Sequence, residues 1–417
     1  MSTSSVQEIA PQLIPDNQVT RRILPVVGFT FVAYFSVGVP LALLPTYAHL
    51  QLGVNASIAG LLVSIQYIAT FASRPRAGRM ADTRGPRQTV RYGLLFCAAS
   101  GFFLLLAALL KHSFWFSIDS LVLSRLVLGV GESMTSTGST MWGIGRVGSE
   151  RTARVISWNG VANYLALAIG APVGVLLGSR WGFAGAGLLI LLVCIASYVV
   201  ATGLAPTAPL KGHPAHLLPL RRILLRVTPY GLALALGGMG FGIIGTFITL
   251  YFIHRSWQGA ALSLTIYGIS FMGVRLVFPG VIERFGGFPV AIVSFIVELA
   301  GLLLLGFGNS PGLAYAGCCL TGLGFSFVFP ALAVEAANVF PTSVRGSVLG
   351  VYSAFIDLSF FLSGPIAGVI IHLYGYLAAF LAIAGAVLLA LTLSIWLAFS
   401  AKPPIIASTG AKVTREA

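Results

Sequence analysis

Residues 183–204 read FAGAGLLILLVCIASYVVATGL, a stretch that contains no charged side chain. A helix rises about 1.5 Å per residue, and the hydrocarbon layer of a membrane is about 30 Å thick. Roughly 20 predominantly apolar residues are therefore enough to cross that layer. The stretch is typical of a transmembrane helix, so we predict an integral membrane protein.

The composition of the whole chain agrees with this prediction. Of its 417 residues, 57% are hydrophobic and 9% are charged, whereas soluble domains carry roughly 25% charged residues. In a soluble protein the net charge of +14 would suggest nucleic acid as a partner. Here the basic residues form short clusters between apolar runs, as they do beside membrane spans. We therefore exclude a soluble fold and expect the lipid bilayer, and no nucleic acid, as a partner.

The same length criterion finds twelve candidate spans. Gly and Pro are frequent within them, which predicts kinked and closely packed helices, because neighbouring helices can satisfy the freed backbone groups. The four cysteines lie in apolar runs and form no CxxC pair, so we expect neither a disulfide nor a metal site. The spans are expected near 24–47, 57–77, 90–110, 115–143, 152–178, 183–204, 229–253, 260–280, 288–308, 312–338, 346–372 and 376–399.

The positions of Lys and Arg predict how the spans are oriented. Most of the 25 Lys and Arg residues lie before the first span, in loops that follow even-numbered spans, or after the last span. Lys111, Arg180 and Arg255 lie in loops on the other side, and Arg125 lies inside a span. Loops rich in Lys and Arg stay on the cytoplasmic side. Both termini are therefore expected in the cytoplasm, and the first apolar run is too long for a cleaved signal peptide.

An internal repeat divides the chain into two halves. Shifts of 201 and 194 residues superpose Arg, acidic and Gly positions, which are chemically restrictive. Because the halves share a register without inversion, we expect an all-α integral membrane fold of two parallel six-helix repeats. The coinciding pairs are Arg74 with Arg275, Asp82 with Glu283, Gly85 with Gly286, Asn163 with Asp357, Gly170 with Gly364 and Gly174 with Gly368. The predicted parts are a cytoplasmic tail at 1–23, a six-helix bundle at 24–205, a basic cytoplasmic linker at 206–227, a second bundle at 228–400 and a cytoplasmic tail at 401–417.

A loop rich in glycine and arginine follows the second span. Residues 78–87 read GRMADTRGPR, which places Gly78, Asp82, Gly85 and Arg87 in the pattern G-x-x-x-D-x-x-G-x-R. Glycines permit a tight turn, and an acid among arginines can form a charge latch in one conformation and lose it in another. The alternative is an ordinary basic turn beside the membrane.

On these residues the chain resembles the major facilitator superfamily, whose signature has this pattern at this place. The resemblance implies a solute transporter of twelve helices. We assign Gly78, Asp82, Gly85, Arg87, Glu283 and Arg345 to the cytoplasmic gate. Glu335, ten residues before Arg345, is expected to pair with the arginines there, and no role for Glu298 follows from the sequence.

The fourth span contains two charged residues, Arg125 and Glu132, in a segment similar to the family's Arg and G-x-G pattern. They are seven residues apart, which is two helical turns on one face. A charge that faces lipid costs several kcal/mol, so both should point into the interior of the bundle. Either they act in transport or they form a structural ion pair.

The eleventh span contains Asp357, twelve residues after the basic end of that span at Arg345. This spacing is about 18 Å along a helix and places the carboxyl near the middle of the membrane. Asp357 is the repeat partner of Asn163, and sites in such transporters form between the halves. We predict that Glu132 and Asp357 carry protons and that Arg125 tunes one of them or holds an anionic substrate group. A structural hydrogen bond between helices is the alternative for Asp357.

Aromatic and amide side chains on the helices that line the cavity of the resembled fold are candidates for substrate contact. Core packing is the alternative for each aromatic residue. The segment 240–245 matches G-x-G-x-x-G, but it lies in an apolar span without a preceding strand, so no nucleotide site is expected. We therefore expect no enzyme and no cofactor. The candidates are Tyr34, Gln66, Tyr67, Trp158, Asn159, Asn163, Tyr267 and Phe325.

The second half resembles the YhhS-type bacterial branch of the superfamily in segments such as 329–331, 335–336, 357–359 and 364–365, together with 131–133. This resemblance implies a monomeric transporter of the bacterial inner membrane, in which protons drive the export of a drug, sugar or metabolite. Uptake or facilitated diffusion of a sugar or organic anion is the first alternative. A membrane receptor or scaffold that transports nothing is the second.

Overall fold

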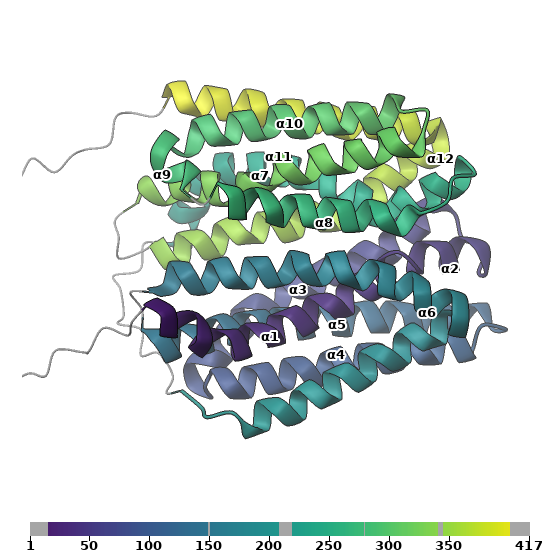
Figure 1. Ribbon diagram of the computed structural model, residues 1–417, viewed down its shortest axis with the longest axis horizontal. Helices are drawn as coiled ribbons and strands as arrows, with labels where there is room; N and C mark the ends of the chain where they lie inside the picture. Colours follow the sequence, from purple (N-terminus) through teal and green to yellow (C-terminus); the bar gives the residue numbers. More distant parts are fainter. Residues whose placement is uncertain (1–15, 149–150, 208–218, 279, 341–344, 401–417) are drawn as a thin grey trace, which may run out of the picture.

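The computed structural model describes residues 16–148, 151–207, 219–278, 280–340 and 345–400 (Figure 1). The described part is entirely helical and contains no strand, as the fold class predicts. Its helices are α1 (Asp16–Leu41), α2 (Leu44–Leu50), α3 (Ala56–Thr83), α4 (Pro86–Leu109), α5 (Phe114–Val147), α6 (Thr152–Gly203), α7 (Leu220–His254), α8 (Ala260–Val277), α9 (Val281–Phe285), α10 (Gly287–Phe307), α11 (Pro311–Asn338) and α12 (Arg345–Ser400).

Ten of the described helices are long and apolar enough to cross a membrane. Two of these, α6 and α12, have 52 and 56 residues, and each contains one glycine with non-helical backbone angles, Gly182 (φ 63°) or Gly375 (φ 84°). Glycine adopts positive φ without the steric cost of a side chain, so the chain turns back at these two positions. The ten helices thus supply the twelve predicted spans.

Helices α1–α6 pack mainly against one another, and so do α7–α12. The two most extensive contacts between these groups are α3 along α12 and α6 along α8, with smaller contacts of α2 and α3 with α7. The repeat relates α3 to α8 and the first part of α6 to the first part of α12, so the two junctions are copies of each other. The interface between the halves therefore has the symmetry of the repeat.

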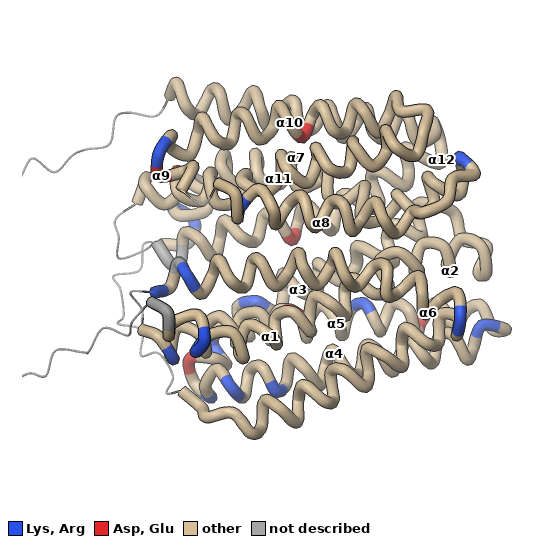
Figure 2. Tube along the Cα trace, in the orientation of Figure 1, with Lys and Arg blue, Asp and Glu red and all other residues tan. Residues whose placement is uncertain are grey.

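The ends of the helix bundle differ in charge. Figure 2 shows that Lys and Arg gather where α3 ends and α4 begins, whereas few lie at the opposite end. We call the first end, which holds Arg84, Arg87 and Arg146, the basic end, and the other end, where α3 begins, the far end. The helices at the basic end reach beyond the predicted spans: α1 begins at Asp16 and α7 begins at Leu220, inside the predicted tail and linker. Residues 208–218 of that linker, and the tails at 1–15 and 401–417, lie outside the described residues.

Small residues bring the halves into close contact at the far end. A Cβ atom on Gly60 of α3 would lie 2.5 Å from the carbonyl oxygen of Gly364 on α12. One turn further, a Cβ on Gly368 would lie 2.8 Å from the oxygen of Ala56. At the other junction, Thr265 of α8 donates a hydrogen bond of 3.0 Å to the carbonyl oxygen of Ala168 on α6. The far end is therefore closed by backbone contacts between the halves.

Candidate functional site

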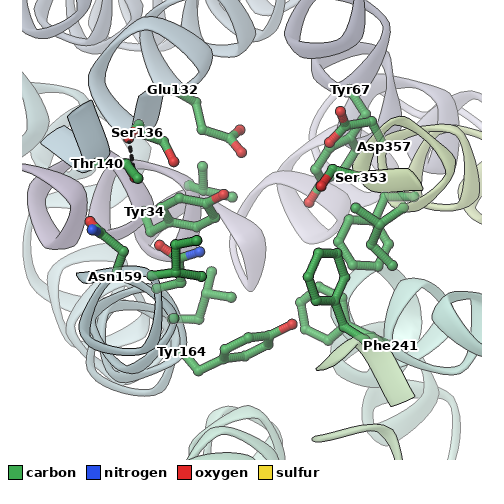
Figure 3. A pocket seen from close by; sticks show the side chains of 18 of the residues that line it. Tyr34, Tyr67, Glu132, Ser136, Thr140, Asn159, Tyr164, Phe241, Ser353 and Asp357 are labelled. Atoms are coloured by element: carbon green, nitrogen blue, oxygen red, sulfur yellow. Dashed lines mark hydrogen bonds between the residues drawn. The ribbon is translucent and has the colours of Figure 1, made fainter. Parts of the chain in front are cut away.

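A cavity of about 250 Å³ lies between the two halves. The cavity extends from the middle of the bundle toward the basic end. Its lining near the basic end includes Ile156, which is 46% exposed. Figure 3 shows Glu132 and Asp357 on opposite sides of this space. The cavity is lined by Tyr34, Val37, Tyr67, Arg74, Glu132, Ser136, Thr140, Ile156, Asn159, Gly160, Asn163, Tyr164, Leu167, Phe241, Arg275, Phe325, Phe329, Ser353, Ile356, Asp357 and Phe360.

Asp357 forms an ion pair with Arg74 across the junction of α3 and α12. The pair is bidentate: Nη2 of Arg74 donates to Oδ1 of Asp357 over 2.8 Å, and Nε donates to Oδ2. The Asp357 side chain is 4% exposed and that of Arg74 is 30% exposed. Within the described residues it is the one ion pair between Lys or Arg and an acid. The carboxylate predicted to carry a proton is therefore held by an arginine of the opposite half.

Arg74 was expected in the basic loop, and the sequence did not suggest it as a site residue. Its repeat partner Arg275 also lines the cavity. The coincidence of two arginines at a shift of 201 residues was the available signal. Both lie just inside the predicted ends of the spans at 57–77 and 260–280, and counting them among the loop charges concealed this signal.

Glu132 reaches the cavity from α5 and faces two polar side chains of α3. Nε2 of Gln66 lies 3.4 Å and Oγ1 of Thr70 lies 3.5 Å from Oε2 of Glu132. Both distances are at the long end for hydrogen bonds, and the Tyr34 hydroxyl is a further hydrogen-bonding neighbour of the carboxyl. The expectation that Glu132 points into the interior cavity agrees with this placement.

Arg125, in contrast, does not line the cavity. Its side chain is 1% exposed, and Nη2 donates to Oε1 of Gln66. The reason is the close crossing of α3 and α5 at Gly129, where a Cβ would lie 2.9 Å from the backbone nitrogen of Thr70. Gln66 is thereby placed between the two charged residues of α5. Gln66 connects Arg125 to Glu132, and Arg125 is not among the residues that line the cavity.

Five of the eight aromatic and amide candidates line the cavity, and three do not. Gln66 is the bridge to Arg125, and Trp158 packs beside a buried cluster that includes Val155. Tyr267 is 1% exposed, with its ring 5.2 Å from that of Phe241. The five that line the cavity are Tyr34, Tyr67, Asn159, Asn163 and Phe325. A helical face predicts the direction of a side chain but not which neighbouring helix covers it.

Two of the lining amides differ in their freedom to bind a solute. Asn159 accepts a hydrogen bond from Thr30 and donates one of 3.0 Å to the carbonyl oxygen of Val155. Oδ1 of Asn163 is buried without a partner among the described residues. Asn163 therefore retains an unused polar atom at the cavity.

The gate motif forms the expected turn but no charge latch in this conformation. Gly85 has φ 95° and precedes α4, as its repeat partner Gly286 has φ 83° and precedes α10. Asp82 is exposed and forms no ion pair with the described residues. Nη1 of Arg87 donates instead to the carbonyl oxygen of Leu204 over 3.1 Å. The latch expected at Asp82 is therefore not formed among the described residues, and its role as a gate stays a prediction.

The remaining gate residues lie around the same end. A Cβ on Gly78 would have no atom within 4 Å, and Glu283 is exposed on α9. Arg345 begins α12, but its side chain lies outside the described part of the structure. Glu335 accepts a hydrogen bond of 2.9 Å from the backbone nitrogen of Gly287 at the start of α10. The expected pairing of Glu335 with the arginines near Arg345 falls on side chains outside the described residues and stays a prediction.

Glu298 on α10 is fully buried outside the cavity. Neither of its carboxylate oxygens has a partner among the described residues. It packs against two glycines: a Cβ on Gly240 would overlap its carboxyl, and one on Gly324 would lie 2.5 Å from its backbone nitrogen. This residue has no contact with the site at Arg74 and Asp357 in the part of the chain described.

Comparisons with known proteins agree with this architecture. The chain matches the family profile described as Major Facilitator Superfamily over residues 26–359 and 277–416. It is 49% identical over 375 residues to an uncharacterized MFS-type transporter of Burkholderia pseudomallei (strain K96243), covering 90% of this chain and 91% of the relative. It is 43% identical over 388 residues to the uncharacterized MFS-type transporter YhhS of Escherichia coli (strain K12), covering 93% and 95%.

Two solved structures share the fold at low sequence identity. The nucleoside transporter NupG matches with a TM-score of 0.74 and 16% identity, covering 91% of this chain and 99% of that chain. A D-xylose-proton symporter matches with a TM-score of 0.74 and 14% identity, covering 90% and 96%. At this identity the likeness extends to the fold alone. The family profile and the two relatives confirm a transporter rather than an enzyme. The profile and the solved structures confirm the predicted fold class.

Proposed function

This chain belongs to the major facilitator superfamily, and from that premise we propose that it exports a small solute in exchange for protons by alternating access. The family makes it a multi-pass membrane transporter. The direction, the coupling to protons and the location in a bacterial inner membrane, with both termini in the cytoplasm, are parts of the proposal. Protons and one small-molecule solute are its partners, and the working unit is a monomer.

The ion pair between Arg74 and Asp357 is the observation that carries this proposal. It joins the two halves at the wall of the cavity between them. Asp357 cannot both carry a proton and keep its full electrostatic attraction to Arg74. Uptake of a proton by Asp357 therefore weakens a contact between the halves. This links proton binding to the relative movement of the bundles.

Glu132 provides a second acidic group in the same cavity. It faces Gln66 and Thr70 over 3.4 and 3.5 Å and forms no ion pair with the described residues, so no salt bridge has to break when it gains a proton. We propose that a proton moves between bulk water and these two acids during the cycle. Moving one charge through a membrane potential of 100 mV releases about 2.3 kcal/mol, which is enough to drive useful expulsion.

The conformation supports a direction for the first step. With the basic end in the cytoplasm, the cavity faces the cytoplasm and the glycine contacts close the far end. A cytoplasmic solute can then enter while Asp82 is free of its latch. Rocking of the halves opens the far end, and the gate motif at residues 78–87 closes the basic end.

The test is substrate-triggered proton movement in proteoliposomes with an imposed pH gradient, screened over drugs, sugars and organic acids. Glu132→Gln and Asp357→Asn should each abolish coupled proton movement. Asp119→Asn is the matched control, because this carboxyl lies on α5 like Glu132 but is exposed near the far end. Wild-type coupling in both cavity variants would refute the assignment of the proton carriers. Downhill flux retained in Asp357→Asn would favour a facilitator.

A further inference from the structure

The repeat places four residues around the interface between the halves, and their chemistry is not symmetric. Arg74 on α3 and Arg275 on α8 are repeat partners, and so are Asp357 on α12 and Asn163 on α6. All four line the cavity. At one junction Arg74 is paired with the carboxylate of Asp357. At the other junction, the place of the carboxylate is occupied by the neutral amide of Asn163.

Arg275 consequently lacks an acidic partner among the described residues. Its Nε and Nη2 donate to the carbonyl oxygen of Ser326 over 3.1 and 2.5 Å, and Nε also lies 3.0 Å from the Ser326 hydroxyl oxygen. The guanidinium lies 4.7 Å from the centre of the Phe271 ring. These contacts fix the side chain in place but do not neutralise its charge.

The third nitrogen of this guanidinium is directed at the opposite half. Nη1 would lie 3.2 Å from a Cβ on Gly160, which is three residues before Asn163 on α6. Nη1 has no hydrogen-bond partner within the described part of the chain. The absence of a side chain at Gly160 lets Nη1 approach α6 this closely, and both residues line the cavity. A cation held in place at a cavity wall with a free donor is suited to an anion.

The surroundings add a second polar atom and an apolar wall. Oδ1 of Asn163 is buried and unpartnered among the described residues, so its amide can turn to present either donor or acceptor. The ring of Tyr164 stacks on that of Phe271 with centroids 3.4 Å apart, and Phe325 and Phe329 line the same cavity. A small organic molecule can thus place its charged group at Arg275 and its body against aromatic rings.

We propose that Arg275 and Asn163 form an anion-binding subsite, so that the transported solute is a small organic anion carrying a carboxylate or phosphate group. The solute anion supplies to Nη1 of Arg275 the negative charge that Asp357 supplies to Nε and Nη2 of Arg74. This inference rests on the proposed transport function of the same cavity, but not on its direction or its coupling to protons. A solely structural Arg275 would hold α8 against Ser326 and would not discriminate between anionic and neutral solutes.

Binding can be measured on purified full-length protein by isothermal titration and by thermal unfolding at constant ionic strength. The probes are acetate, L-lactate, D-gluconate, benzoate and inorganic phosphate, and the neutral counterparts of the four organic acids are acetamide, L-lactamide, D-glucose and benzamide. We expect the wild type to bind at least one of these anions and to bind its neutral counterpart at least about tenfold more weakly. The amide of the lactate or benzoate pair is nearly the same size as the acid, so charge accounts for the difference.

Two variants test the subsite from opposite directions. Arg275→Gln removes the cation, and Asn163→Asp supplies the missing carboxylate and should pair with Arg275. Each should weaken binding of the anion by about 10-fold to 100-fold, as expected for the loss of a charge-assisted hydrogen bond. Arg226→Gln is the control, because Arg226 is exposed outside the cavity. This control should bind the anion within about threefold of wild type.

Three results would overturn the anion subsite: equal binding of anionic and neutral partners, unchanged anion affinity in both test variants, or no binding of any of the five anions. Flux in proteoliposomes separates this inference from the proposed function. Transport of neutral solutes independent of Arg275 contradicts the subsite alone. Anion binding that depends on Arg275 without flux of any bound solute contradicts the transport proposal alone.

Discussion

The ion pair between Arg74 and Asp357 can be tested by a double-mutant cycle, because its two members differ in exposure. Arg74→Gln leaves a carboxylate on a side chain that is 4% exposed, and an unpaired buried charge costs about 3–5 kcal/mol. Asp357→Asn leaves a guanidinium on a side chain that is 30% exposed and can be hydrated from the cavity. We expect that variant to lose about 1 kcal/mol. The variant carrying both substitutions has no unpaired charge, so it should also lose only about 1–2 kcal/mol.

The coupling free energy obtained from the cycle should therefore be about 2–5 kcal/mol. Reversible unfolding in mixed detergent micelles at pH 8 measures it, since the high pH disfavours protonation of the unpaired carboxylate. A parallel cycle of Arg74→Gln with Asp119→Asn serves as the control, because Asp119 is exposed near the far end. That cycle should be additive within about 0.5 kcal/mol. Additivity in the Arg74 and Asp357 cycle as well would show that the pair contributes nothing between the halves.

Three other substitutions test the packing. Gly364→Ala places a Cβ 2.5 Å from the carbonyl oxygen of Gly60 and should destabilise the closed far end by about 1–3 kcal/mol. In the Gly364→Ala background, labelling of Ser57→Cys by a water-soluble thiol reagent should rise several-fold. Unchanged labelling would argue against a closed far end. Glu298→Gln should leave the free energy of unfolding within about 1 kcal/mol of wild type, because the Glu298 carboxyl accepts no hydrogen bond from the described residues. A loss above about 2 kcal/mol would show that the ionised carboxylate stabilises the fold. Gly85→Ala should lower the free energy of unfolding by about 1–3 kcal/mol, since φ is 95° there, and an unchanged midpoint of thermal unfolding would contradict the strained turn.

Hydrophobicity and the repeat predict most of the fold. The apolar runs locate the spans because lipid requires each crossing to satisfy its own backbone. The two turns at Gly182 and Gly375, where the backbone angles are not helical, lie between predicted spans. The ends of the helices are less predictable. Outside the hydrocarbon layer a helix can continue through polar residues, so hydropathy does not predict where it ends. Helices α1 and α7 accordingly extend into the stretches expected as tail and linker.

The candidate site was predictable only in part. Asp357 and Glu132 could be placed from depth in the membrane and from the cost of exposing a charge to lipid. Arg125 meets the same criteria as Glu132 but is covered by Gln66, because a crossing of α3 over α5 is a property of two helices. The partner of Asp357 was equally hidden, since its distance in sequence from Arg74 is 283 residues. Pattern along one helix constrains a side chain's direction, and only packing decides what it meets.

The departures from the repeat carry more information about chemistry than the repeat itself. At a shift of 193 residues, Gly129 and Gly131 fall on Gly322 and Gly324, and Glu132 then falls on Phe325. The glycines keep the same role in both halves, since Gly131 packs on α4 as Gly324 packs on α10. A symmetric scaffold that rocks between two states needs equivalent backbone contacts on both sides. The proposed proton coupling and recognition of a solute need charges that differ between the halves. Glu132 and Asp357 are acids whose repeat partners are uncharged. Arg275 has no acidic partner among the described residues, whereas its repeat partner Arg74 is paired.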